Sequence, residues 1–239
     1  MSRPYVYIHT HSSIDGNILT MNLDEFEKGS RIYKELVFNP ETQVMNVVGN
    51  ISGKTSSEVA ITNYQTPDLN ESAPLVPEGD YIAKKHAPMY YISIDPRGEL
   101  AWVDNQFTYG NVTSHILEVL TNQVINAYKA FLREKEISYI ITGEDELDYE
   151  LMLEKLYSKF GMERVLISGG GTLNWSFMQR GLVDEISIVL PPIANGDSDA
   201  TRLFSAKPPY SSIEAMAFKL KDVDIIENDV LWIRYVPKK

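Results

Sequence analysis

The spacing of hydrophobic residues changes repeatedly along the chain between a pattern typical of strands and one typical of helices. Residues 5–8 form a short β-rich run followed by the turn Asp15-Gly16, which predicts an N-terminal strand. Residues 23–37 carry apolar side chains at helical spacing, with Asp24 and Glu25 in the first turn, and this predicts a helix. Strand and helix patterns therefore follow each other from the N-terminus onward.

The remaining elements continue this alternation. The pattern predicts strands at residues 44–48, 89–94, 116–120, 138–142, 165–167 and 186–191, helices at 124–133, 148–160 and 172–180, and a C-terminal hairpin of residues 215–226 and 230–236. The proline-rich stretch 65–79 predicts a surface loop or a mobile lid. Alternating strands and helices are typical of βαβ units, so we expect an α/β fold with a mostly parallel central sheet. The hairpin adds antiparallel strands, and residues 1–239 are expected to form one domain.

Composition and charge narrow the class of ligand. The 239 residues include no cysteine, which excludes disulfides, thiolate zinc sites and cysteine nucleophiles. Lys and Arg number 22 against 33 Asp and Glu, so the formal net charge is −11, and such a surface repels nucleic acid and anionic membranes. The sequence shows neither a secretion signal nor an apolar run of the roughly 18 residues that a membrane helix needs. We therefore expect a cytoplasmic protein that binds a small molecule rather than nucleic acid or a membrane.

Three consecutive glycines give the strongest local signal for a ligand. The predicted strand 165–167 leads into Gly169-Gly170-Gly171-Thr172 and then into a helix. Glycines let the backbone approach a ligand closely, and the first N–H groups of the helix are free to bind an anion. This favours a phosphate site, with a tight turn that binds nothing as the alternative. The dinucleotide motif G-x-G-x-x-G is not matched, because Asn174 occupies its last position.

Two further segments carry candidate chemistry. Gly49-x-x-x-Gly53-Lys54-Thr55 is one residue shorter than a P-loop, so we expect a glycine turn near a phosphate, with Lys54 as counter-charge, rather than an NTPase site. His9 and His11 share one face if the first strand continues. They are interpreted as satisfied or substrate-facing histidines, and a two-histidine metal site is the less favoured alternative.

Taken in order, several motifs resemble one known family. Ser13-Ile14-Asp15-Gly16, a central Ser52-Gly53-Lys54-Thr55, Ser93-Ile94-Asp95-Pro96-Arg97-Gly98, and Gly169–Asn174 followed by Gly181–Ile186 resemble the reductase domain of bacterial riboflavin biosynthesis, the RibD C-terminal domain. That family belongs to the dihydrofolate-reductase-like superfamily. The resemblance covers residues 3–236, with Ser168 where the family often has glutamate.

The resemblance implies a dihydrofolate-reductase-like three-layer α/β/α fold, NADPH as cofactor and a homodimer. It places the glycine block against the cofactor pyrophosphate, Arg97 near a 2′-phosphate, and the turn at Asp15 near the nicotinamide and substrate. The cofactor-binding residues expected on this basis are Gly53, Lys54, Thr55, Ser93, Asp95, Arg97, Thr142, Gly143, Gly169, Gly170, Gly171, Thr172 and Leu173. Ser13, Asp15 and Gly16 are expected to bind the substrate.

The expected reaction is hydride transfer from NADPH to a riboflavin-pathway substrate resembling 5-amino-6-ribosylamino-pyrimidinedione phosphate. Reduction of an open-chain ribose imine also needs a proton, and Asp15 and His11 are the candidate catalytic residues, with His9 or water as alternatives. A same-fold reductase of a pteridine or another small carbonyl compound is the second hypothesis. A nucleotide-binding protein without catalysis, suggested by Ser168, is the third.

Overall fold

The computed structural model describes residues 2–18, 21–39, 41–208, 211–227 and 229–238. The chain forms two compact units. Unit 1 comprises Met1–Pro4 and Val47–Val165, and unit 2 comprises Tyr5–Asn46 and Leu166–Lys239. Strand β7 (Arg164–Ile167) is where the chain passes from the first unit into the second. The single domain expected for residues 1–239 stays a prediction.

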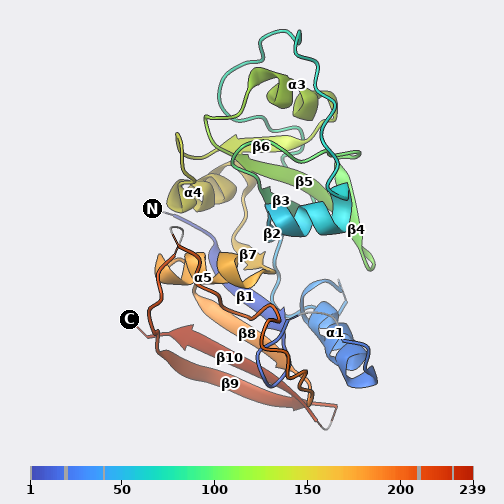
Figure 1. The fold of residues 1–239 in the computed structure, drawn as a ribbon, viewed down its shortest axis with the longest axis vertical. Coiled ribbons are helices and arrows are strands. Elements are labelled where there is room, and N and C mark those ends of the chain that lie inside the picture. Colours follow the sequence, from blue (N-terminus) through green and yellow to red (C-terminus); the bar gives the residue numbers. More distant parts are fainter. Residues whose placement is uncertain (1, 19–20, 40, 209–210, 228, 239) are drawn as a thin grey trace. The chain divides into compact units, whose positions relative to one another are not determined.

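Unit 1 is an α/β unit built on a mostly parallel sheet. Its elements are β2 (Gly49–Gly53), α2 (Lys54–Ser57), the π-helix η1 (Glu58–Thr62), β3 (Tyr90–Ile94), β4 (Gln106–Tyr109), β5 (Val112–Leu120), α3 (Asn126–Glu134), β6 (Ser138–Ile141) and α4 (Tyr149–Phe160). Strands β2, β3, β5 and β6 run parallel, and β4 pairs antiparallel with the first half of β5 (Figure 1). The mostly parallel sheet predicted from the sequence is confirmed.

The core of unit 1 lies where α3 packs against the sheet. Tyr128 and Leu132 from α3 are fully buried among Trp102, Ile116 and Tyr139. The helix α4, predicted at 148–160, ends at Gly161, whose φ of 67° lies in the left-handed region that glycine adopts readily. The prediction of a strand at residues 44–48 was wrong, because the strand begins only at Gly49.

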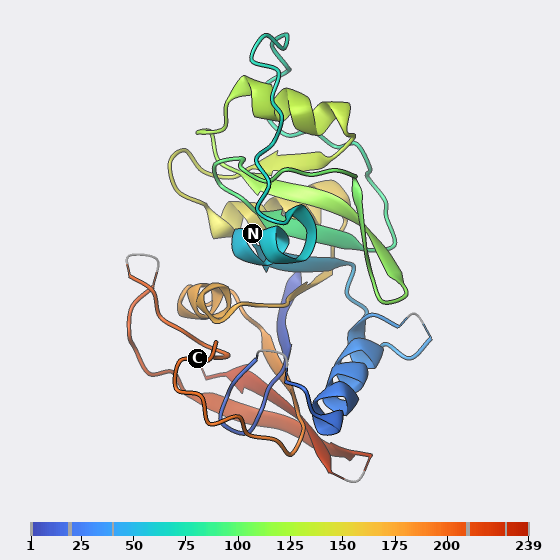
Figure 2. The ribbon, with the colours of Figure 1, turned by 45° about the vertical axis from the view of Figure 1, so that its right-hand side comes forward.

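The loop of residues 63–88 lies over α3 and the edge of β6 (Figure 2). Tyr81 exchanges two backbone hydrogen bonds with Tyr139, each 2.9 Å long. Asp80 accepts hydrogen bonds from the backbone of Ile141 at 2.8 Å and from Lys155 at 2.9 Å. The predicted surface loop is therefore confirmed, and these contacts anchor it to the sheet.

Unit 2 combines one parallel strand pair with the predicted C-terminal hairpin. Its elements are β1 (Tyr5–His11), α1 (Asp24–Val37), α5 (Gly171–Gln179), β8 (Glu185–Leu190), β9 (Phe218–Ile226) and β10 (Val230–Pro237). The strand order is β1-β8-β10-β9, with β1 parallel to β8 and the other pairs antiparallel. The antiparallel C-terminal hairpin is confirmed.

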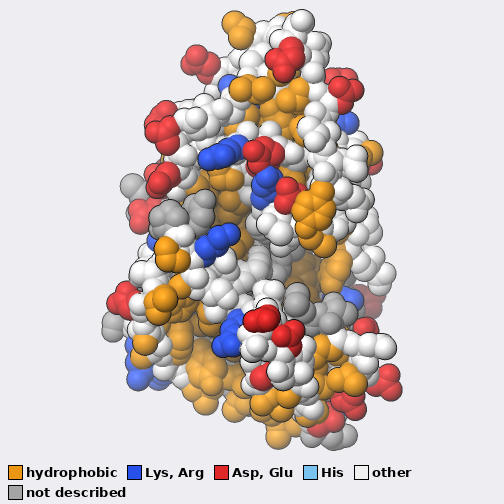
Figure 3. All heavy atoms as spheres, in the orientation of Figure 1, with side chains coloured by type: hydrophobic (Ala, Val, Ile, Leu, Met, Phe, Trp, Pro, Cys, Tyr) orange, Lys and Arg blue, Asp and Glu red, His pale blue; other side chains and the backbone are white. Residues whose placement is uncertain are grey.

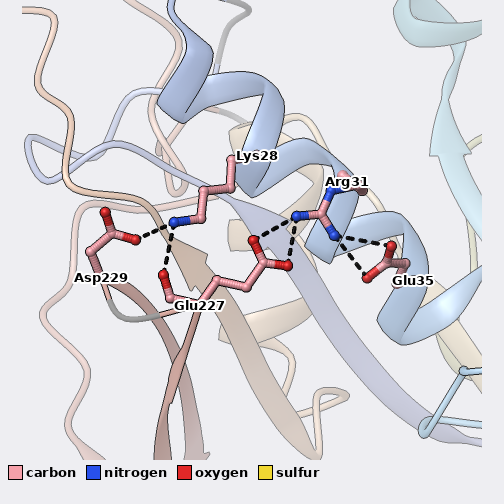
Figure 4. Close-up of polar contacts among 5 residues, drawn as sticks. All are labelled: Lys28, Arg31, Glu35, Glu227 and Asp229. Atoms are coloured by element: carbon pink, nitrogen blue, oxygen red, sulfur yellow. Dashed lines mark hydrogen bonds and ion pairs between the residues drawn. The ribbon is translucent and has the colours of Figure 1, made fainter.

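Helix α1 covers one face of this sheet. Ile32 packs with Val189, Val230 and Trp232 in a buried cluster. Charged side chains on the exposed side of α1 contact the turn between β9 and β10 (Figure 4). Arg31 donates two hydrogen bonds to Glu227, at 2.6 and 2.7 Å, and also pairs with Glu35. The helix is thus held to the hairpin by an apolar cluster inside and an ion network outside.

Candidate functional site

In unit 1 the predicted cofactor residues gather at one edge of the sheet. Parallel strands end at the same edge, and ligands of α/β sheets bind outside the carboxyl ends of the strands. The residues that follow or end β2, β3 and β6 at this edge are Gly53, Lys54, Thr55, Ser93, Asp95, Arg97, Thr142 and Gly143. A cavity of about 330 Å³ lies here, lined by Arg97, Gln123 and Asp145.

Arg97 is the cation available at this cavity. It is exposed and makes no hydrogen bond or ion pair with any residue in the described part of the chain. Gln123, beyond β5, donates a hydrogen bond to Asp145, beyond β6. An unpaired guanidinium suits a phosphate, whereas a carboxylate suits ribose hydroxyls. Sequence reasoning missed Gln123 and Asp145, although both occupy the turn after a predicted strand.

Gly143 shapes the turn that presents Asp145. Its φ is 96°, and a Cβ at this position would come within 1.9 Å of the carbonyl oxygen of Glu146. The neighbouring Thr142 is fully buried, and its N–H donates to Leu120 O at 2.7 Å. Both residues therefore support the cavity through the backbone.

Three of the predicted residues in unit 1 are engaged within the protein. Lys54 forms ion pairs with Glu99 and, at 3.3 Å, with Glu58. The hydrogen bond from Lys54 to Glu99 raises the pKa of the lysine. Ser93 is fully buried and lies 2.7 Å from the hydroxyl of Ser57. Asp95 is also fully buried, so neither Ser93 nor Asp95 reaches the cavity directly.

In unit 2 the glycine block, Gly169–Gly171, leads into the start of α5. Gly169 has a φ of 115°, which favours glycine, and it precedes a cis peptide bond to Gly170. A Cβ at Gly169 or Gly170 would meet no atom within 4 Å, whereas one at Gly171 would lie 2.2 Å from Arg202 O. Gly170 is the N-cap of α5 and supplies no side-chain cap for the first N–H groups of the helix, and Thr172 and Leu173 are half-buried.

The segment 201–205 joins this block to the turn that contains Asp15. Ser205 N–H donates to Gly171 O and Leu203 N–H donates to Gly16 O, both at 3.1 Å. Gly16 has a φ of 80° with open space where a Cβ would lie. Unit 2 therefore brings together the predicted pyrophosphate residues and the predicted substrate residues, which are distant in sequence.

Asp15 is held as a carboxylate. It accepts hydrogen bonds from the hydroxyl of Ser13 and from the backbone of Asn195, at 3.0 Å, and Gly196, at 2.7 Å. These bonds, that from Ser13 first, lower its pKa to about 2. Asp15 is therefore ionised at neutral pH and has no proton to donate.

His9 is a structural residue of the sheet. Its Nε2–H donates to Tyr33 O at 3.1 Å, so Nδ1 accepts from the Ser187 hydroxyl at 2.8 Å. The indole N–H of Trp232 donates to the same Ser187 oxygen. Burial lowers the pKa of His9 to about 4, and the imidazole is neutral.

His11 packs against helix α1. Its ring lies 4.3 Å from that of Phe26, and a Cβ on Gly29 would come within 2.8 Å of its Nε2. Burial lowers its pKa to about 4 as well.

No three His, Cys, Asp or Glu side chains among the described residues cluster as metal ligands would. Within that same part of the chain, no helix has the length and apolar character to cross a membrane.

Comparisons with known proteins point to one family. The family model described as the RibD C-terminal domain matches residues 103–232, more than half of the chain. A 104-residue stretch is 31% identical to the 2,5-diamino-6-ribosylamino-4(3H)-pyrimidinone 5′-phosphate reductase of Methanothermobacter thermautotrophicus, covering 44% of this chain and 47% of that protein. The reductase of the same name from Archaeoglobus fulgidus is 26% identical over 205 residues, which are 83% of this chain and 84% of that protein.

A solved structure extends the similarity to the fold. Acinetobacter baumannii RibD is similar with a TM-score of 0.62 and 19% identity, over 99% of this chain and 58% of that chain. The matched parts thus span about half of the Methanothermobacter reductase and somewhat more of RibD. The likeness confirms the predicted dihydrofolate-reductase-like fold class.

Proposed function

The chain belongs to the RibD C-terminal domain family, and from this premise we propose that it is an NADPH-dependent reductase of a ribosylamino-pyrimidine phosphate. The observation that carries the proposal is the open glycine block at the start of α5, joined by residues 201–205 to the turn at Asp15. The names of the archaeal relatives supply the substrate class.

Each unit, taken by itself, carries residues that suit one part of a dinucleotide cofactor. Gly169 and Gly170 leave space beside the first N–H groups of α5, where a pyrophosphate accepts hydrogen bonds. Arg97 has no protein partner among the described residues and lies at a cavity that suits a 2′-phosphate. Asp145 and Gln123 in that cavity offer an acceptor and a donor for ribose hydroxyls.

When bound, NADPH would supply the hydride for C1′ of an open-chain ribose imine, whose nitrogen would take up a proton. In our proposal Asp15 acts as a fixed anion, since its pKa of about 2 keeps it charged. The carboxylate is exposed, so it can face a protonated imine while it keeps its hydrogen bonds to Ser13, Asn195 and Gly196. His11 is neutral at physiological pH, so we assign the proton to water and to His11 a role in orienting the end of β1.

Steady-state NADPH oxidation tests the proposed function. Purified protein is assayed with 2,5-diamino-6-ribosylamino-4(3H)-pyrimidinone 5′-phosphate and, separately, with dihydrofolate. We expect turnover with the pyrimidine substrate and none with dihydrofolate. Turnover with dihydrofolate alone would favour a pteridine reductase, and tight NADPH binding without turnover of either would favour a nucleotide-binding protein.

The homodimer implied by the resemblance is part of the same proposal. Strand β9 is the last strand of the sheet in unit 2 and exposes Leu220, Val223 and Ile225, the last to 70%. Apolar side chains are visible over β9 and β10 in Figure 3. Light scattering of the purified protein checks the mass, and a monomer at micromolar concentration would contradict a stable dimer. The cytoplasmic location stays a prediction.

A further inference from the structure

Leu203, in segment 201–205 of unit 2, is hydrogen-bonded through both of its backbone polar groups. Its N–H donates to Gly16 O at 3.1 Å, in the turn that contains Asp15. Its carbonyl oxygen accepts a hydrogen bond of 3.0 Å from the side-chain amide of Asn174, in the first turn of α5. One residue therefore connects the proposed substrate turn to the helix that begins at the glycine block.

Backbone hydrogen bonds hold both ends of this segment. Ile18 N–H donates to Thr201 O at 3.0 Å, next to the substrate turn, and Ser205 N–H donates to Gly171 O at 3.1 Å, at the start of α5. These two bonds depend on the path of the backbone rather than on particular side chains. The bond donated by Asn174, in contrast, depends on the identity of a side chain, so one substitution removes it.

Asn174 is a buried amide of which the protein uses the donor half. The residue is only 1% exposed, and its backbone N–H donates to Gly170 O at 3.1 Å. Its Nδ2 donates to Leu203, whereas its Oδ1 meets no hydrogen-bond partner in the described part of the chain. Burying a polar group is unfavourable unless it is hydrogen-bonded, so a position that only fills space suits an apolar residue. The donor to Leu203 is therefore what this position requires.

A second buried polar residue of α5, Ser176, differs from Asn174 in where its donor goes. Ser176 is 2% exposed, and its hydroxyl donates to Thr172 O at 2.9 Å, within the same helix. Asn174 instead directs its donor out of the helix, to Leu203 in segment 201–205. The two residues thus form a matched pair, in which one hydrogen bond leaves the helix and the other stays inside it.

We propose that Asn174 is a positioning residue, which sets the turn containing Asp15 relative to the start of α5 by its hydrogen bond to Leu203. All three residues belong to unit 2. The inference rests on the proposed function, in which Asp15 stabilises a protonated imine. A reacting group displaced by roughly 1 Å can lower a rate about 100-fold, so the place of this carboxylate matters to the reaction. Asn174 acts on it only through the backbone.

The experiment compares three variants with the wild type by steady-state kinetics and by calorimetric titration with NADPH. Asn174→Leu keeps a side chain of similar size and Asn174→Ala shortens it, and both lack the donor. For both we expect kcat with the pyrimidine substrate to fall about tenfold, because Asp15 loses its alignment, while the Kd for NADPH stays within about twofold of the wild type. Ser176→Ala is the matched control and should leave kcat and the Kd unchanged.

Amide hydrogen exchange measures the connection without substrate or cofactor. The N–H groups of Leu203 and Ile18 are bonded between segment 201–205 and the substrate turn. Both should therefore exchange faster in Asn174→Leu than in the wild type or in Ser176→Ala. The N–H groups inside α5 should keep their protection, which shows that the helix itself is intact.

The outcomes separate the inference from the proposed function. Unchanged exchange at Leu203 would overturn the inference, and so would faster exchange with a normal kcat. A loss of NADPH affinity as large as the loss of kcat would also overturn it, since the start of α5 would then be disturbed too. If Asn174→Leu does not fold, Asn174→Ala gives the same comparison. Absence of turnover by the wild type would instead refute the proposed function, and the exchange rates would then decide whether Asn174 holds the turn.

Discussion

The two units differ in how burial acts on one titratable group in each of them. In unit 1 burial and a neighbouring acid raise the pKa of Glu118 well above its ordinary value, which favours the neutral carboxyl group. In unit 2 burial lowers the pKa of His9 to about 4, so the imidazole is neutral. The same desolvation cost acts in both, but its sign on the pKa depends on which form carries the charge. The charges left for ligands, such as those of Arg97 and Asp15, are therefore at the surface.

The units also differ in how they would hold a ligand. The cavity of unit 1 is lined by the side chains of Arg97, Gln123 and Asp145, whereas the site proposed for unit 2 consists of the backbone at Gly169 and Gly170. A backbone site depends on conformations that few residues adopt. A site formed by charged side chains binds a ligand only if those charges are not already paired with other groups of the protein. Mutations at the two sites should therefore act differently.

The largest expected effect concerns the turn beneath the side-chain site. In Gly143→Ala the new Cβ would lie 1.9 Å from Glu146 O at a φ of 96°. We expect a loss of about 3 kcal/mol in the free energy of unfolding, measured by urea denaturation. Gly53→Ala is the control, since nothing lies within 4 Å of its Cβ position. Equal stability of the two variants would show that the turn adapts to a side chain.

A pH series tests the neutral histidine of unit 2. The folded-state pKa of His9 is about 4, below its ordinary value of 6.5, so the unfolded chain takes up a proton first as the pH falls. The stability from His9 is present above pH 6.5 and is lost progressively toward pH 4. Between pH 7 and 5 we expect a loss of about 2 kcal/mol from this group, by urea denaturation. His9→Gln should show a shallower dependence, and an unchanged slope would contradict a neutral His9.

Binding of NADPH and NADH to two variants tests whether the unpaired Arg97 contributes more to cofactor binding than the paired Lys54. Arg97→Ala should weaken NADPH binding about tenfold and leave NADH binding unchanged, because only NADPH carries the 2′-phosphate. Lys54→Ala should change either affinity less, since Lys54 is already paired with Glu99 and Glu58. Calorimetric titration with both cofactors measures the difference. A larger effect of Lys54→Ala would show that the lysine exchanges its carboxylate partners for phosphate.

The smallest expected effect concerns the ion network between α1 and the hairpin. Arg31 and Glu227 are both well exposed, and exposed ion pairs contribute little and are screened by salt. Arg31→Ala should lower the thermal midpoint slightly at low salt and hardly at all in high salt. A large, salt-independent loss would show that the aliphatic part of Arg31 packs on the hairpin instead.

The sequence predicted features that depend on the backbone, such as turns, helix ends and the hairpin, better than it predicted which side chains pair. The glycine-to-helix transition at Gly169, the helix stop at Gly161 and the C-terminal hairpin follow from local conformational preferences, which the sequence displays directly. Strand β2 was missed because its residues, Gly49-Asn50-Ile51-Ser52-Gly53, have weak strand propensity and pair with β3 through tertiary contacts. The apolar run at residues 44–48, just before β2, led to the prediction of a strand in the wrong place.

The pairing of charges could not be predicted in the same way. Lys54 meets Glu99, which is 45 positions away, and Gln123 meets Asp145 across two neighbouring strands. Such partners are brought together only by the order of strands in the sheet. The burial of Asp95 beside Glu118 likewise depends on the pairing of β3 with β5. Local motifs thus identify where a site lies but not which of its charges are available.

Calorimetric titration of NADPH into the wild type and two variants tests whether the glycine block binds the cofactor pyrophosphate. Gly170 has an ordinary φ of −70° and open space around its Cβ position, so Gly170→Ala and Gly170→Asp should both fold. We expect micromolar binding to the wild type, weaker binding to Gly170→Ala, and none to Gly170→Asp, whose charge repels the pyrophosphate. Undiminished NADPH binding by a folded Gly170→Asp variant would show that the pyrophosphate does not bind at the glycine block.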